Sequence, residues 1–179
     1  MFFALWPDEG AQEELARAVA GEVADAAGRG LPPRNLHATL AFLGSVPQER
    51  LGELASLARE VAAAWPGGAP GLRFRQIEHW ARVSILVVTA EDEDERAHAL
   101  ARALKDACVR GGFAPDLKPF RAHVTVARKV MQARAARSLP ELTWRFTSFA
   151  LIESDTRPGG SVYSVRESFV LGKTQKVPD

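Results

Sequence analysis

The chain has 179 residues, of which 46% are hydrophobic and 25% charged, which is ordinary for a globular domain with a sizeable core. The 23 basic residues nearly cancel the 22 acidic ones, and the longest apolar stretches, such as Val83–Val88, reach strand length only. The near-neutral net charge says little about partners, and the short apolar stretches argue against a membrane-spanning helix. We expect residues 1–179 to form a single domain.

The first residues, MFFALWPDEG, have neither the basic region nor the complete apolar region of a secretion signal. Cys108 is the one cysteine, so the chain has no partner for an internal disulfide. We expect a cytoplasmic protein with no membrane association, and a Cys108 that serves as a small core residue.

The first half of the chain alternates strand-like and helix-like segments. Apolar residues at four-residue spacing, such as Leu15, Val19 and Val23, indicate helices. In chain order we predict a strand over Phe2–Trp6, a helix from Pro7 to Gly28, a strand over Leu36–Leu43 and a helix from Pro47 that Pro66–Gly71 breaks.

The second half continues the alternation. We predict strands over Leu72–His79 and Arg82–Thr89, a helix over Asp92–Arg110, a strand over Phe120–Ala127, an Arg-rich helical or irregular stretch, and strands over Thr143–Glu153 and Ser161–Leu171 with a turn at Arg157–Gly160 between them. The acidic run Glu91–Glu95 is expected to begin the helix, where the helix dipole favours negative charge. Helices interleaved with antiparallel strand pairs indicate an α+β fold.

One short pattern occurs twice, as His37-Ala38-Thr39-Leu40 and as His123-Val124-Thr125-Val126, 86 positions apart (123 minus 37). Each copy lies inside a predicted strand, where side chains alternate between two faces. Each strand therefore presents a histidine and a threonine on one face. The other face should be the core face, with Leu36, Ala38, Leu40 and Phe42 in the first copy and Ala122, Val124 and Val126 in the second.

The surroundings of both copies are basic. Residues 117–140 contain six Lys or Arg and no acid, and Pro32–Ser45 contains Arg34 and no acid. On charge alone such a segment is more often a solvated face. Two copies of one motif, however, make coincidence a poor explanation, and we expect the two imidazoles to face one another across a groove.

Two facing imidazoles suit the hydrolysis of a phosphate ester. Because the unperturbed pKa of histidine is about 6.5, a neutral ring can take a proton from water while a protonated ring gives one to the leaving oxygen. Hydroxyls of Thr39 and Thr125 can donate hydrogen bonds to phosphate oxygens, and arginine adds a fork-shaped cationic donor. This chemistry needs no metal and no cofactor.

The two motifs, the strand MFFALW, the segments HATLAFLG and FRAHVTVAR, and the closing strand around Tyr163 together resemble the two-histidine phosphoesterase superfamily, and more narrowly the bacterial RNA 2′,3′-cyclic phosphodiesterases, also called 2′-5′ RNA ligases. The resemblance spans essentially the whole chain. Family members often have proline where this chain has Ala122, a difference that leaves the strand intact.

The resemblance implies a bilobal α+β fold in which two pseudo-symmetric antiparallel sheets, flanked by helices, surround a central groove. It implies His37 and His123 as catalytic residues, and Thr39, Thr125 and Arg128 as substrate-binding residues. It implies RNA with a 2′,3′-cyclic phosphate end as the substrate, a 2′-phosphate as the product, and the joining reaction at the same site. We expect a monomer.

Three other interpretations stay open at this stage. A metal hydrolase is disfavoured, because neither motif has a second histidine or carboxylate at ligand spacing, and His79 and His98 lie in unrelated contexts. A non-catalytic RNA-binding module would use an exposed aromatic residue, Phe3, Phe42 or Tyr163, although Phe42 falls on the predicted core face. A smaller substrate, such as a cyclic phosphate of ADP-ribose, would use the same chemistry.

Overall fold

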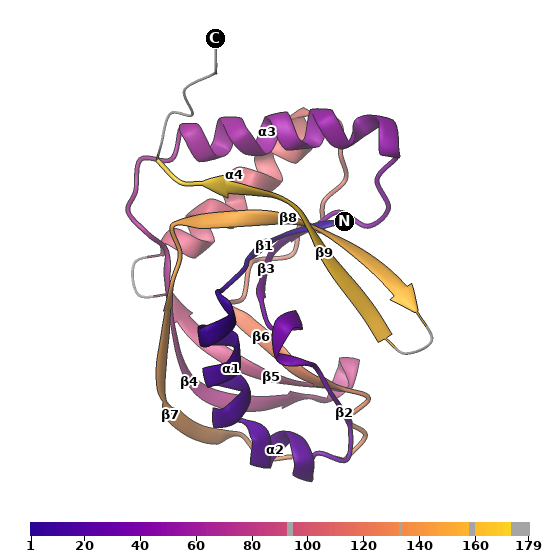
Figure 1. The fold of residues 1–179 in the computed structure, drawn as a ribbon, viewed down its shortest axis with the longest axis vertical. Coiled ribbons are helices and arrows are strands. Elements are labelled where there is room, and N and C mark those ends of the chain that lie inside the picture. Colours follow the sequence, from indigo (N-terminus) through magenta and orange to yellow (C-terminus); the bar gives the residue numbers. More distant parts are fainter. Residues whose placement is uncertain (93–94, 133, 158–159, 173–179) are drawn as a thin grey trace.

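The computed structural model describes residues 1–92, 95–132, 134–157 and 160–172, and the strands form two antiparallel sheets (Figure 1). The first sheet has the order β3-β1-β8-β9, with β1 (Phe2–Leu5), β3 (Ala38–Phe42), β8 (Ser148–Arg157) and β9 (Gly160–Val170). The second has the order β2-β6-β5-β4-β7, with β2 (Arg29–Gly30), β4 (Gly71–Trp80), β5 (Ile85–Asp92), β6 (His123–Arg128) and β7 (Arg137–Arg145).

The two sheets have matching strand orders. The run β3-β1-β8-β9 corresponds to the run β6-β5-β4-β7, and β2 is added at the edge of the second sheet. In both runs a strand, a helix and a motif strand follow one another along the chain: β1, α1 (Glu9–Ala18) and β3 in one, β5, α4 (Arg96–Arg110) and β6 in the other. The expected α+β fold with two pseudo-symmetric antiparallel sheets is confirmed.

An N-cap, an interruption and a 3₁₀ turn set the ends of the first three helices. Helix α1 begins after Asp8, whose carboxylate accepts the Ala11 backbone N–H at 2.8 Å, a usual N-cap contact. The helix predicted to continue to Gly28 is interrupted at Val19, and a separate α2 (Ala20–Asp25) follows. Helix α3 (Leu51–Ala63), preceded by a 3₁₀ turn at Gln48–Arg50, packs against β9 and α4.

The core joins both sheets through buried aromatic side chains. Phe3, Phe149 and Phe169 of the first sheet form a cluster with ring centroids 5.0 to 6.3 Å apart, and all three are almost fully buried. Phe74 and Trp144 of the second sheet pack edge to face at 4.7 Å in the same core cluster. Cys108 is buried, as expected, and burial raises its pKa to about 11.

The core face predicted for the first motif is wrong at Phe42, whose side chain is 53% exposed. Ala4 pairs with Thr39 and Phe3 pairs with Ala41, so Leu40 is an extra residue that forms a β-bulge. Leu40 and the next residue, Ala41, both point into the core, and the alternation is reversed beyond the bulge. Phe42 therefore leaves on the same side as His37 and Thr39.

The second motif has the same bulge at the matching position. Val87 pairs with Thr125 and Leu86 pairs with Ala127, which leaves Val126 as the extra residue. Val126 and Ala127 are both buried, and the next side chain, Arg128, is exposed on the side of His123 and Thr125. The bulge thus places Arg128 on the face of the histidine, a consequence that strict alternation would miss.

Two other sequence predictions are wrong in detail. The acidic run does not begin α4: Glu91 and Asp92 belong to β5, Glu91 pairs with Arg73 at 2.9 Å, and the helix starts at Arg96. Residues 93–94 lie outside the described residues, as do residues 158–159 of the predicted turn and residues 173–179. The end of the Arg-rich stretch, from Arg137, begins β7, which pairs with β4. The predicted strand Thr143–Glu153 joins the end of β7 to the start of β8, a separate strand that pairs with β1.

Replacing Phe3 by alanine should lower the free energy of unfolding by about 3–5 kcal/mol, because it leaves a cavity among buried rings. The matched control is Phe42→Ala, in which the lost ring is mostly exposed and the change should be small. Denaturant unfolding measures both variants. Equal losses of unfolding free energy in the two variants would contradict the exposed position that the bulge gives Phe42.

Candidate active site

The structure brings the two motifs together although they belong to different sheets. His37 immediately precedes β3, His123 begins β6, and β3 and β6 contact each other. The charges of Arg128 and His123 both lower the pKa of His37, so both groups of the second motif lie within electrostatic reach of the first. The two histidines therefore lie at neighbouring strands of different sheets.

Both imidazoles are held in the same way. The Nδ1 atom of His37 lies 2.7 Å from the backbone oxygen of Asn35, and Nδ1 of His123 lies 2.6 Å from the backbone oxygen of Arg121. A carbonyl oxygen only accepts hydrogen bonds, so Nδ1 carries the proton in both rings. Each Nε2 is therefore left to accept a proton when the ring is neutral and to donate one when it is charged.

The His37 ring is enclosed by aromatic side chains. It stacks with Phe2 at 4.9 Å and with Trp6 at 5.2 Å, and it meets the ring of Tyr163 edge to face at 5.2 Å. Burial among these rings is the main cause that lowers the pKa of His37 to about 4, and the positive charges of Arg128 and His123 lower it further, against the hydrogen bond to Asn35. His37 is therefore neutral at neutral pH.

The His123 ring has a more polar setting. It packs against Trp80 at 4.5 Å, and the guanidinium of Arg121 lies over Trp80 at 4.4 Å. Glu78 accepts hydrogen bonds from Trp80 at 3.0 Å and from Arg121 at 2.9 Å, which fixes both groups. Burial also lowers the pKa of His123, but less than that of His37.

A pocket of about 280 Å³ opens between the two motifs. Thr39 and His123 both line it, together with Phe42, Trp80 and Phe120. Thr125 lies two residues after His123 in β6, on the same face, and is half-buried. Of the predicted site residues, Thr39 and His123 line this pocket, Thr125 and Arg128 leave β6 on the face of His123, and His37 lies within electrostatic reach of Arg128 and His123.

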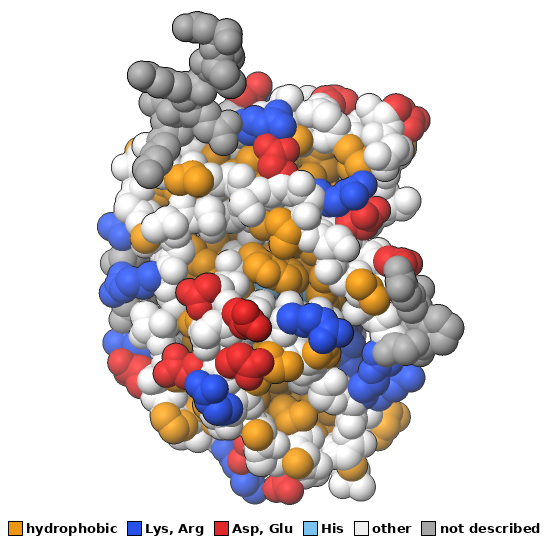
Figure 2. Space-filling view, viewed as in Figure 1, with side chains coloured by type: hydrophobic (Ala, Val, Ile, Leu, Met, Phe, Trp, Pro, Cys, Tyr) orange, Lys and Arg blue, Asp and Glu red, His pale blue; other side chains and the backbone are white. Residues whose placement is uncertain are grey.

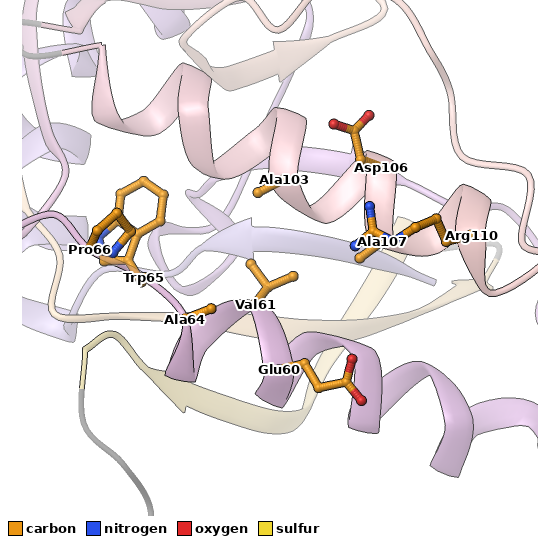
Figure 3. Close-up of a pocket in the computed structure, with 9 residues that line it drawn as sticks. All are labelled: Glu60, Val61, Ala64, Trp65, Pro66, Ala103, Asp106, Ala107 and Arg110. Carbon is orange, nitrogen blue, oxygen red and sulfur yellow. The ribbon is translucent and has the colours of Figure 1, made fainter.

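A larger hollow, of about 490 Å³, lies between α3 and α4 (Figure 3). Its lining includes Trp65, Val61, Ala107, Glu60 and Arg110, and none of the motif residues. Within the residues that the structure describes, no three His, Cys, Asp or Glu side chains are grouped so as to hold a metal ion. No helix in the described part of the chain is long and apolar enough to cross a membrane.

Sequence reasoning missed the aromatic enclosure of His37. The sequence predicts Phe2 and Trp6 as parts of a strand and offers Tyr163 as a base-stacking residue. Their contacts with His37 depend on the pairing of β1 with both β3 and β8, which the sequence does not reveal. Of the three aromatic residues considered for stacking, Phe3 is fully buried, Phe42 is exposed, and Tyr163 packs on His37.

Two sheets of matching strand order, each presenting one imidazole to a common space, are the arrangement of a two-histidine phosphoesterase. The family model of the 2′-5′ RNA ligase superfamily matches residues 6–158. The chain therefore belongs to the 2′-5′ RNA ligase superfamily.

Curated relatives and solved structures agree with this assignment. An RNA 2′,3′-cyclic phosphodiesterase of Thermus thermophilus is 33% identical over 149 residues, covering 79% of this chain and 74% of the relative. An RNA 2′,3′-cyclic phosphodiesterase of Escherichia coli is 27% identical, covering 96% of both chains. The crystal structure of E. coli LigT complexed with NADP⁺ superposes with a TM-score of 0.81 at 25% identity, covering 96% of both chains.

Replacing Arg128 by glutamine should raise the pKa of His37 above about 4, since one of the charges that lower it is removed. The pKa should stay below 6.5, because burial among the aromatic rings persists. NMR titration of the imidazole signals measures this shift, with Arg102→Gln on α4 as the control. An unchanged pKa in Arg128→Gln would place Arg128 away from His37.

Proposed function

We propose that this chain hydrolyses RNA 2′,3′-cyclic phosphate ends to 2′-phosphates without a metal ion, with His37 and His123 as the catalytic pair. The observation that carries the proposal is the matched pair of imidazoles, each held by Nδ1 and each with Nε2 left for proton transfer. The names of the curated relatives, RNA 2′,3′-cyclic phosphodiesterase, support the substrate.

In the proposed reaction the cyclic phosphate lies between the two Nε2 atoms. One histidine accepts a proton from water as the water oxygen forms a bond to phosphorus. The bond from phosphorus to O3′ breaks, and the other histidine donates its proton to O3′, which leaves a 2′-phosphate and a free 3′-hydroxyl. Thr39 and Thr125 donate hydrogen bonds to the non-bridging oxygens, and Arg128 neutralises the charge that develops there.

The environments of the two rings favour different roles. His37, whose pKa is about 4, is neutral over a wide pH range and suits proton acceptance. His123 has a less lowered pKa, and a bound phosphate anion would stabilise its protonated form. We therefore propose His37 as the base and His123 as the acid.

The same displacement with a 5′-hydroxyl in place of water would join two RNA molecules through a 2′-5′ linkage. The name of the superfamily supports this second reaction. A small cyclic phosphate, such as one on ADP-ribose, fits the same chemistry, and turnover of the two substrate types under identical conditions distinguishes them.

We propose in addition that residues 1–179 form one two-lobed domain that acts as a monomer in the cytoplasm. Both histidines come from one chain, so the proposed centre requires no second copy. The buried thiol of Cys108 is compatible with a reducing compartment.

Replacing either histidine by alanine should lower kcat by about 10²- to 10⁴-fold, because a general acid or base is lost. Binding of the oligonucleotide should change little. The assay uses an oligoribonucleotide with a 2′,3′-cyclic phosphate end in excess chelator, with the phosphate position assigned by phosphorus NMR. Full activity in either variant, or activity only after metal is added, would exclude the proposed mechanism.

The dependence of kcat/KM on pH should be bell-shaped. Its acid limb should lie near pH 4, where His37 becomes protonated, and its alkaline limb below pH 6.5, where free His123 loses its proton. The alkaline limb of kcat should lie at higher pH, because the bound anion favours protonated His123. Rate measurements across pH 3.5–9 check both profiles. If His37→Ala leaves the acid limb of kcat/KM unaltered, the roles of the two histidines are reversed.

A further inference from the structure

One edge of the second sheet carries basic side chains from three distant segments. Arg29 of β2 lies directly opposite Arg128 of β6, so both side chains leave the same face of the sheet. The Val130 backbone N–H donates to the Ser84 oxygen at 3.0 Å, which joins the turn at Lys129 to the turn that contains Arg82. We call Arg29, Arg82, Arg128 and Lys129 the basic edge.

The basic edge has no acidic residue in its own segments. Residues 26–48, 79–90 and 117–140 contain no Asp or Glu. All four basic side chains are exposed, and within the described part of the chain Arg82, Arg128 and Lys129 form no ion pair. Lys and Arg side chains gather on this side of the molecule, at the right of Figure 2, over the ends of β2, β5 and β6.

The acids of α2 are engaged by bases outside the basic edge. Glu22 lies 3.0 Å from Arg137 and 4.0 Å from Arg134, and Asp25 lies 3.9 Å from Arg134. Arg29 has an interaction of its own, as does Asp155 of β8. The charges of the other three members of the basic edge, Arg82, Arg128 and Lys129, are therefore left to act on solvent and ligands.

The rim of the pocket that Thr39 and His123 line is also basic, but its charges are used within the protein. Arg121 pairs with Glu78 at 2.9 Å. Lys118 lies 3.5 Å from Asp116, and Lys105 donates to the backbone oxygen of Lys118 at 2.6 Å. The basic edge therefore has more positive charge to offer a polyanion than this rim of the pocket has.

We propose that the basic edge binds the phosphodiester backbone of the RNA chain on the 5′ side of its cyclic end, an inference that rests on the proposed function. A 2′,3′-cyclic phosphate occurs at a 3′ end, so the rest of the chain leaves the reacting centre in the 5′ direction. Arg128 belongs both to that centre and to the edge, which makes the edge continuous with the site. Contacts to phosphates favour longer RNA without reading its sequence.

The experiment compares two substrates, a nucleoside 2′,3′-cyclic monophosphate and an oligoribonucleotide with the same cyclic end. The double variant Arg82→Gln/Lys129→Gln should raise KM for the oligonucleotide roughly 5- to 25-fold at about 0.1 M salt and leave turnover of the mononucleotide unchanged. The slope of log KM against log salt should fall by about 0.7 for each lost phosphate contact. The matched control, Arg102→Gln/Arg110→Gln, removes two exposed charges from α4.

A second variant separates the charge of Lys129 from its backbone. Lys129 has a φ of 59°, a conformation that glycine adopts more easily. Lys129→Gly should therefore keep or raise the melting temperature, and it should still raise KM for the oligonucleotide.

The outcomes distinguish the two proposals. If the wild type turns over both substrates with equal KM, or the double variant changes nothing, the basic edge is not the RNA-binding surface and the hydrolytic function stands. If Lys118→Gln raises KM for the oligonucleotide instead, the RNA leaves the reacting centre on the side of Lys118, and the inference is overturned. If neither substrate is converted, the proposed function fails and the inference fails with it.

Discussion

Two backbone carbonyls determine what the candidate site can do. The oxygens of Asn35 and Arg121 each hold the Nδ1 proton of the histidine two residues later, so both rings present Nε2 to the space between the sheets. Without these hydrogen bonds the tautomer and orientation of each ring would vary independently. The threonines, the arginine and the aromatic side chains around the two imidazoles can assist a reaction only because the two Nε2 atoms are fixed.

The two motif strands share a second local feature, a β-bulge. In each motif strand a bulge follows the threonine, and the next two residues turn inward before a side chain returns to the site. At that returning position the first strand carries Phe42 and the second carries Arg128. A symmetric backbone thus supplies an asymmetric site, with a cationic group beside His37 and an exposed aromatic ring in the pocket that His123 lines.

Much of this could be predicted from the sequence, because hydrophobic periodicity and the repeated motif are local signals. The strands around His37 and His123, helices α3 and α4, and the shared face of each His-Thr pair follow from alternation and four-residue spacing. Phe42 could not be placed, since a bulge depends on the partner strand. The same is true of the boundary between β7 and β8, because the predicted strand Thr143–Glu153 overlaps both, and the two strands belong to different sheets. The low pKa of His37 depends on Phe2, Trp6 and Tyr163, which only the fold brings together.

The matching strand orders have a consequence for how the chain holds the site together. Each sheet supplies one histidine, one threonine and the bulge that orients the next side chain, so neither sheet alone contains an acid and a base. The first sheet joins the beginning of the chain, β1 and β3, to its later part, β8 and β9, and four of the five strands of the second sheet lie between them in sequence. No single cut of the backbone can therefore divide the molecule into one lobe with His37 and another with His123.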